Sequence, residues 1–351
     1  MSKLTAAFGS SHSVMLTCTL EDWQKGFKVF DLKGRYFDRQ GDPVSYDELL
    51  ALAPSNANDL ITDEAIAKRY HAVRDAIARM RADVIAAKLD VLLICGDDQH
   101  EFFSDDLMPP FVIYYGDSIL NPKRKEVPPG PEHWYKRAQS LRQEEHGDVH
   151  YPVNKDLALH LITGLTDKGF DVTSMRKTPP DQYEGHAFSF IHRFYMEQGS
   201  PVPVVPIMLN TYYPPNPPTP ARCVAIGKAM RELIESFPGD LRVGFMASGG
   251  LSHFQAEEDL DGDVIDALKR GDTDFLSKLS VKRLQAGSSE IRNWLVLAGC
   301  VGKDFDMEWV SYNPGYRTPA LTGTGLGFAT WRAKGTIQQT GAKAREELHA
   351  V

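Results

Sequence analysis

The chain has 351 residues, 42% hydrophobic and 25% charged, which is typical of a globular protein with one large domain or two small ones. Its net charge of −8 argues against a general nucleic-acid binder, because phosphate binding needs a basic surface. No apolar run approaches the roughly 20 residues that span a bilayer. Four widely spaced cysteines and the lack of an apolar signal segment near Met1 predict a cytoplasmic protein.

Apolar periodicity predicts helices and strands that alternate along the chain. Thr62 is a candidate N-cap for a helix with an apolar residue every three or four positions, and the apolar run 91–95 (VLLIC) is the strand that follows. Asn154 is expected to open a helix that stops near Gly169. Further expected elements are strands near 170–172, at 204–209 and at 242–246, and helices at 220–234, near 264–269 and near 289–297.

This alternation predicts an α/β fold in which helices cover a central, largely buried mixed sheet. The composition does not shift along the chain, so we expect a single catalytic domain over residues 1–336 and a polar tail over 337–351. Three stretches, 17–60, 100–153 and 303–330, are interpreted as long loops, a class that often carries function.

Reactive side chains follow several of the predicted strands or begin predicted helices. In open α/β sheets the ligand crevice lies beyond the carboxyl ends of the strands, so some of these side chains are expected to meet. Taken singly, each has an ordinary structural explanation, such as a loop hydrogen bond or a helix cap. The candidates are His12, the acid-rich run Gly96-Asp97-Asp98-Gln99-His100-Glu101, His186, His253 and Glu290.

Five motifs in a fixed order make the combination more specific than its parts: SSHSVML, the acid-rich run with FFSDDLMPPF, GHAF, SGGLSH and SSEIRNW. This order resembles the class III extradiol ring-cleavage dioxygenases, the family of protocatechuate 4,5-dioxygenase. Among them, long members with a GDDQ-type motif look most like 3-O-methylgallate-type enzymes. The resemblance implies oxidative cleavage of a catechol ring with O2 and a non-haem Fe(II), in aromatic catabolism.

The resemblance also implies which residues hold the metal. His12 matches the first ligand of the family and Glu290 its carboxylate ligand, while two imidazoles and a carboxylate leave one face of iron open. The second histidine ligand is ambiguous. Ligand chemistry favours His100, whereas an ungapped alignment of the strand places Asp98 there. Asp97 and Glu101 would then orient the ligands.

His186 and His253 match the two family histidines that stand in the pocket without binding metal. His253 is the expected base for the diol and His186 the expected acid or oxygen-binding group, and the two roles could be exchanged. Arg317 and Arg193 are candidates for holding a ring carboxylate through a bidentate pair. The expected substrate is a carboxylated or methoxylated catechol, or a hydroxypyridone of similar shape.

Two rival functions use the same fold. A metal-dependent hydrolase would use the same ligands to activate water, and a binding module would carry no chemistry. The presence of both His186 and His253 favours an enzyme. The expected partner is a small aromatic diol, with no nucleic acid or membrane, and a homo-oligomer, either a dimer or a tetramer.

Overall fold

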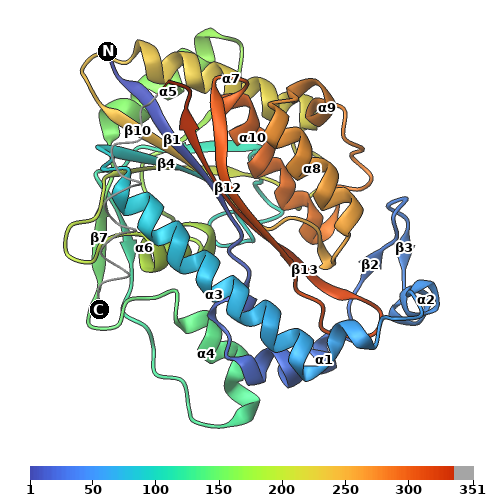
Figure 1. The fold of residues 1–351 in the computed structure, drawn as a ribbon. Coiled ribbons are helices and arrows are strands. Elements are labelled where there is room, and N and C mark those ends of the chain that lie inside the picture. The colour runs from blue at the N-terminus through green and yellow to red at the C-terminus, as the bar shows by residue number, and fades with distance from the viewer. Residues whose placement is uncertain (336–351) are drawn as a thin grey trace, which may run out of the picture.

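The computed structural model describes residues 1–335, and its centre is a nine-stranded mixed sheet (Figure 1). The strand order is β11-β13-β1-β10-β4-β9-β5-β8, with β12 paired to β13. The neighbours β1, β10, β4 and β9 are parallel, whereas β13 is antiparallel to β1, and β5 is antiparallel to β9. The sheet strands are β1 (Lys3–Ser10), β4 (Val91–Asp97), β5 (Phe111–Tyr114), β8 (Thr173–Met175), β9 (Val204–Leu209), β10 (Arg242–Ser248), β11 (His253–Gln255), β12 (Phe305–Pro314) and β13 (Thr322–Ala333).

Ten α-helices and two small two-stranded sheets complete the described part of the chain. The helices are α1 (Lys28–Asp31), α2 (Tyr46–Leu52), α3 (Asp63–Ala86), α4 (Trp134–Ser140), α5 (Lys155–Asp167), α6 (His186–Tyr195), α7 (Pro220–Ser236), α8 (Glu258–Arg270), α9 (Thr273–Ser277) and α10 (Ile291–Val301). The small sheets pair β2 (Tyr36–Phe37) with β3 (Pro43–Val44), and β6 (Ser118–Asn121) with β7 (Val149–Pro152).

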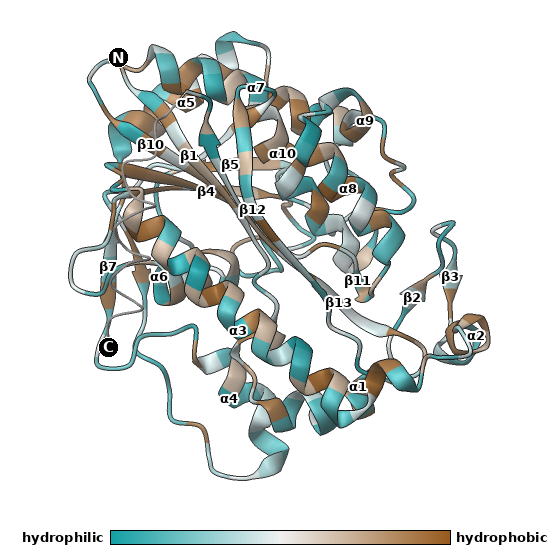
Figure 2. Ribbon diagram, viewed as in Figure 1, coloured by the Kyte–Doolittle hydropathy of each residue, from teal (hydrophilic) through white to brown (hydrophobic). Residues whose placement is uncertain are grey.

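Each face of the sheet has its own hydrophobic core. On β4, Leu93 and Cys95 pack into the core that α5, α7, α8 and α10 share, while Leu92 and Ile94 pack into the core of α3 and α6. Strand side chains alternate between the two faces, so a strand buried on both faces is hydrophobic along its whole length. Figure 2 shows this for β4, whereas α3 mixes hydrophobic and hydrophilic residues.

The structure confirms the expected α/β class and most of the expected elements. Thr62 caps α3 by accepting from Ala65 N–H, and Asn154 caps α5 by accepting from Leu157 N–H. The strand expected at 204–209 is β9, with those bounds. The strand expected near 170–172 lies at 173–175, because the chain first turns through Gly169, whose φ is +81°.

The expectation of long loops was wrong in two places. The stretch 303–330 contains β12 and most of β13, and the stretch 100–153 contains β5, β6, β7 and α4. Figure 1 shows β12 and β13 as a long pair across the front of the sheet. The polar tail predicted for 337–351 lies outside the described residues. Within residues 1–335, no helix has both the length and the apolar character required to cross a membrane.

Candidate functional site

Four parallel strands, β1, β10, β4 and β9, end side by side and bring reactive side chains to one edge of the sheet. His12 follows β1 by two residues, and Asp97 is the last residue of β4. His253 follows β10 through a short turn. Two more side chains come from helix starts, because His186 is the first residue of α6, and Glu290 ends the 3-10 helix that leads into α10.

The ring of His12 is held in one tautomer. Its Nδ1 lies 2.9 Å from the Ser248 hydroxyl oxygen, and that hydroxyl donates its only proton to the Ala187 carbonyl at 2.7 Å. Ser248 can therefore only accept from Nδ1–H, so in the neutral imidazole the Nε2 atom carries the lone pair. This is the arrangement that a metal-ligating histidine needs.

The free Nε2 of His12 faces two carboxylates. Glu290 Oε2 lies 3.2 Å away and Asp97 Oδ1 3.5 Å away. His12 Nε2 and Asp97 Oδ1 have no hydrogen-bond partner within the described chain. All three residues are at most 2% exposed, so acceptors face one another where water does not reach. Buried acceptors without a donor are costly, and a cation between them would remove that cost.

The chemistry of these donors fits a divalent metal ion. His12, Asp97 and His186 place ligand atoms within 4.8 Å of one another, and Glu290 adds a carboxylate beside His12. Burial and the charge of Glu290 raise the pKa of Asp97 to about 6. A bound cation would offset the repulsion between the two carboxylates. Imidazole together with carboxylate is a ligand set suited to transition metals such as Fe(II).

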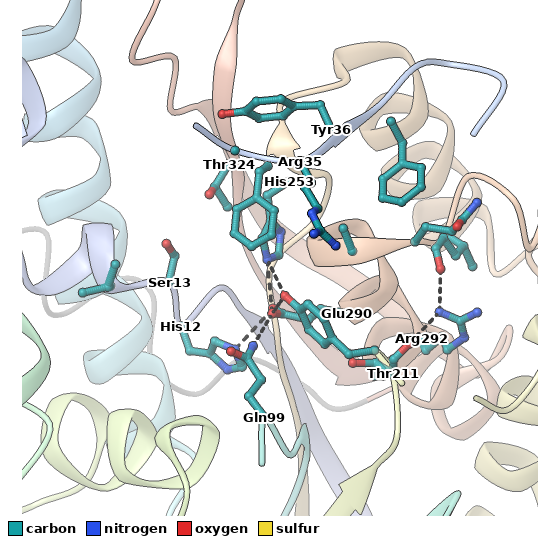
Figure 3. Close-up of a pocket in the computed structure, with 18 of the residues that line it drawn as sticks. His12, Ser13, Arg35, Tyr36, Gln99, Thr211, His253, Glu290, Arg292 and Thr324 are labelled. Atoms are coloured by element: carbon teal, nitrogen blue, oxygen red, sulfur yellow. Dashed lines mark hydrogen bonds and ion pairs between the residues drawn. The ribbon is translucent and has the colours of Figure 1, made fainter. Parts of the chain in front are cut away.

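Glu290 is the most highly bonded residue of the site (Figure 3). Its Oε1 accepts from the Gln99 amide at 3.2 Å and from the Tyr212 hydroxyl at 2.9 Å. Its Oε2 accepts from Gly250 N–H at 2.6 Å. Burial would raise the pKa of Glu290, but the neighbouring histidines, His253 first, hold it well below the ordinary value. The carboxylate is therefore fixed in its ionised form.

His186 is held by Glu101. The Glu101 carboxylate accepts from the backbone N–H of His186 at 2.7 Å and lies 2.9 Å from its Nδ1 through both oxygens. Burial would lower the pKa of His186, but the charge and hydrogen bonds of Glu101 raise it to about 9. Its Nε2 points back toward the centre, 3.8 Å from Asp97 Oδ2.

His253 approaches Glu290 from the other side. Its Nδ1 donates to the Leu251 carbonyl at 2.9 Å, so Nε2 is the atom that faces Glu290 Oε1 at 3.1 Å and the Tyr212 hydroxyl at 3.3 Å. Burial would lower the pKa of His253, but Glu290 raises it. Gly287 lets the ring fit, because a Cβ on Gly287 would meet the ring Cδ2 at 2.0 Å.

The structure does not bring His100 to this centre. Its ring stacks on Tyr213 at 3.9 Å, and its Nε2 pairs with the exposed Asp105 at 3.3 Å. The carboxylate of Asp98 is also engaged elsewhere, because it accepts from the backbone N–H groups of Phe102 and Phe103. Side chains alternate along β4, and this alternation points Asp97 into the site. Asp97 is therefore the member of the acid-rich run that reaches His12.

A cavity of about 1380 Å³ opens in front of the centre. His12, His186, His253 and Glu290 line its deep end, and aromatic side chains such as Phe27 and Tyr36 line its walls. Of the two arginines predicted to hold a carboxylate, Arg317 lines the cavity, but its Nε is 2.9 Å from Asp31. Arg193 does not line the cavity, and its guanidinium pairs with Glu144 at 2.6 Å.

Comparison with known proteins assigns the chain to a family. Residues 62–327 match the family model described as the catalytic LigB subunit of aromatic ring-opening dioxygenase. The chain belongs to this family. The match covers well over half of the chain.

Two curated relatives of the chain are named as dioxygenases. A 2,3-dihydroxyphenylpropionate/2,3-dihydroxicinnamic acid 1,2-dioxygenase from Comamonas testosteroni is 29% identical over 210 residues, which is 60% of this chain and 54% of that protein. A gallate dioxygenase from Pseudomonas putida is 27% identical over 178 residues, 48% of this chain and 50% of that protein. The chain spans about half the length of these curated relatives.

One solved structure, an uncharacterized protein from Escherichia coli K12, aligns with a TM-score of 0.41 and 10% identity. The alignment covers 72% of this chain and 91% of that chain.

The sequence interpretation did not place three residues in direct contact with the site. Asp97 had been assigned an orienting role, Tyr212 lies in a proline-dense loop without a motif, and Arg142 lies in a stretch interpreted as a loop. Strand alternation alone places Asp97 on the same side as Cys95 and Asp98 on the opposite side, but the sequence does not say which side carries the site.

Proposed function

We propose that the chain is an extradiol dioxygenase that opens a catechol-type ring with Fe(II) and O2. The observation that carries the proposal is the set of facing acceptors around His12 Nε2, with Asp97 and Glu290 as the two carboxylates. Family membership supports the chemistry, because the matched family consists of aromatic ring-opening dioxygenase subunits. His12, Asp97 and Glu290 would hold Fe(II), which would supply the Lewis acidity and the electrons for the reaction of a diol with O2.

The ligand set that we propose is His12, Asp97 and Glu290. Asp97 takes the place that the resemblance gives to a second histidine. We leave His186 out of the set because it matches a family histidine that stands in the pocket without binding metal, and because Glu101 holds its ring through Nδ1. A site with two carboxylates is harder than one with two histidines and favours Fe(II) or Mn(II) over softer ions.

The two flanking histidines then divide the proton chemistry. His253 Nε2 lies beside Glu290 and faces the cavity, so it is placed to take a proton from a diol hydroxyl. His186, held by Glu101, donates a proton from Nε2 on the opposite side of the centre. Tyr212 fixes the orientation of Glu290 and touches His253, so it links the base to the ligand.

The substrate that we propose is a carboxylated or methoxylated catechol of the 3-O-methylgallate type, or a hydroxypyridone of similar shape. The gallate dioxygenase relative supports a carboxylated ring. The cavity volume of about 1380 Å³ exceeds the roughly 300–1,000 Å³ that is common for small-molecule pockets, so its size is compatible with a ring of this kind. A homo-oligomer remains a prediction.

The test is oxygen uptake by protein reconstituted anaerobically with Fe(II), on protocatechuate, gallate, 3-O-methylgallate and 3-hydroxy-4-pyridone. We expect uptake with at least one of them and the absorbance of a ring-opened product. The control is His253→Ala, which should retain iron and lose most turnover. Zinc-supported ester or amide hydrolysis, with no uptake in the iron-loaded protein, would contradict the dioxygenase and favour a hydrolase.

A further inference from the structure

Five basic side chains line the cavity, and four of them are already engaged or lie in solvent. Arg317 pairs with Asp31, and Lys282 lies 3.8 Å from Asp42. Arg35 is exposed. Arg292 donates to backbone carbonyl groups, those of Pro218, Thr211, Leu284 and Ser289.

Arg142 differs from the other four. It is 9% exposed, lines the cavity and donates one hydrogen bond, from Nη2 to the His12 carbonyl at 2.8 Å. Its Nε has no hydrogen-bond partner, and within residues 1–335 no ion pair joins the guanidinium to a carboxylate, so Glu101 and Glu290 act on it only through longer-range charge interactions. A buried guanidinium has five N–H donors and cannot lose its charge, so leaving it unpaired is costly.

We propose that Arg142 binds an anionic substituent of the substrate, most simply a ring carboxylate, and so selects carboxylated over neutral diols. The missing partner of the guanidinium arrives with the ligand. Because Arg142 holds the backbone of the metal ligand His12, the anion is bound in the same part of the cavity as the diol. A planar guanidinium matches a carboxylate bidentately. This assignment replaces Arg317 and Arg193 as the carboxylate-binding residue.

The inference rests on the proposed function. A matched pair of ligands tests the role of Arg142 separately from ring cleavage. The ligands are 3,4-dihydroxybenzoate and 3,4-dihydroxybenzamide, which have nearly the same shape and differ in charge. Binding is measured anaerobically by calorimetry with the Fe(II)-loaded protein, and turnover by oxygen uptake. The variants are Arg142→Gln and Arg142→Lys, with Arg124→Gln, a partly exposed guanidinium paired to Glu145, as the control for general charge effects.

We expect the wild-type protein to prefer the benzoate over the benzamide. Loss of one partner of a buried charge pair weakens binding of the other partner strongly. Arg142→Gln should therefore lower this preference by at least about 30-fold, mainly through weaker benzoate binding. Arg142→Lys should retain part of the preference, because it keeps the charge without the fork. Arg124→Gln should bind both ligands as the wild type does.

Iron content and the melting temperature of each variant show whether His12 has moved. An equal loss for both ligands in Arg142→Gln and Arg142→Lys would overturn the role of Arg142 while leaving ring cleavage intact. A wild-type protein that binds benzoate and benzamide equally, yet opens either ring, would overturn it as well. Failure of the iron-loaded wild type to open any diol would instead count against the proposed function.

Discussion

Glu101 accepts hydrogen bonds from both the backbone N–H and the ring Nδ1–H of His186, so one carboxylate fixes the position and the protonation of this imidazole. The pKa of His186 is raised from 6.5 to about 9, so the stabilisation from the pair is fully present below pH 6.5 and is lost as the pH rises through about 9. If His186 donates a proton, turnover falls over the same range.

Replacing Glu101 by Gln tests this link. We expect the alkaline limb of the pH–rate profile of Glu101→Gln to move to lower pH by about one unit or more, because the opposite charge is gone. Metal content should stay close to that of the wild type, since Glu101 bonds to His186 and lies outside the proposed ligand set. An unchanged alkaline limb would show that His186 is not the proton donor.

The metal ligands are tested by comparing Asp97 with His100. We expect Asp97→Ala to bind Fe(II) at least about tenfold more weakly, since even residues that only support a ligand commonly contribute that much. His100→Ala should bind Fe(II) like the wild type, because His100 stacks on Tyr213 away from His12. Anaerobic titration with Fe(II) measures both. The reverse order of affinities would restore His100 as the ligand.

Gly287 tests the placement of His253 without changing a reactive group. A methyl group on Gly287 would overlap the ring of His253, so Gly287→Ala should retain iron and lose most turnover, as His253→Ala does. The matched control is Gly262→Ala on α8, where an added Cβ meets no atom within 4 Å. There we expect full activity and a gain of about 0.5–1 kcal/mol in the free energy of unfolding. Full turnover in Gly287→Ala would contradict the assigned position of His253.

Arg317 is predicted to act on stability. It is 5% exposed, its Nε lies 2.9 Å from Asp31, and Asp31 also accepts from Thr322 Oγ1 at 2.8 Å. Arg317→Met leaves Asp31 buried and unpaired, so we expect a loss of about 3–5 kcal/mol in the free energy of unfolding. The double variant Asp31→Asn/Arg317→Met should recover part of it. Denaturant titrations of the wild type and the two variants provide the measurement, and an unchanged stability with lost benzoate preference would make Arg317 a substrate ligand.

Much of the fold was predictable because local rules and burial agree. The caps Thr62 and Asn154 and the apolar run of β4 are determined by short stretches of sequence. β12 and β13 were missed because their hydrogen-bonding partners are remote, with β13 pairing to β1 across most of the chain. Glycines in β13 also weaken its strand signal.

The candidate site was predictable where a motif carries the residue. His12, His186, His253 and Glu290 do lie around one cavity, as their motifs and the strand ends indicate. The choice within the acid-rich run was not predictable from motif alignment, because it depends on where β4 ends and which face Asp97 takes. Arg142 carries no local signal, since its role follows from the absence of a partner in three dimensions.

The most direct test of the central claim is a single turnover of the Fe(II)-loaded protein with a diol that it binds. Dissolved O2 is followed by electrode and the product by mass spectrometry. We expect one O2 consumed per diol and a ring-opened product heavier than the substrate by both oxygen atoms, with neither seen in Asp97→Ala or Glu290→Ala. Hydrogen peroxide with an intact ring, or unchanged turnover in both variants, would contradict ring cleavage at this centre.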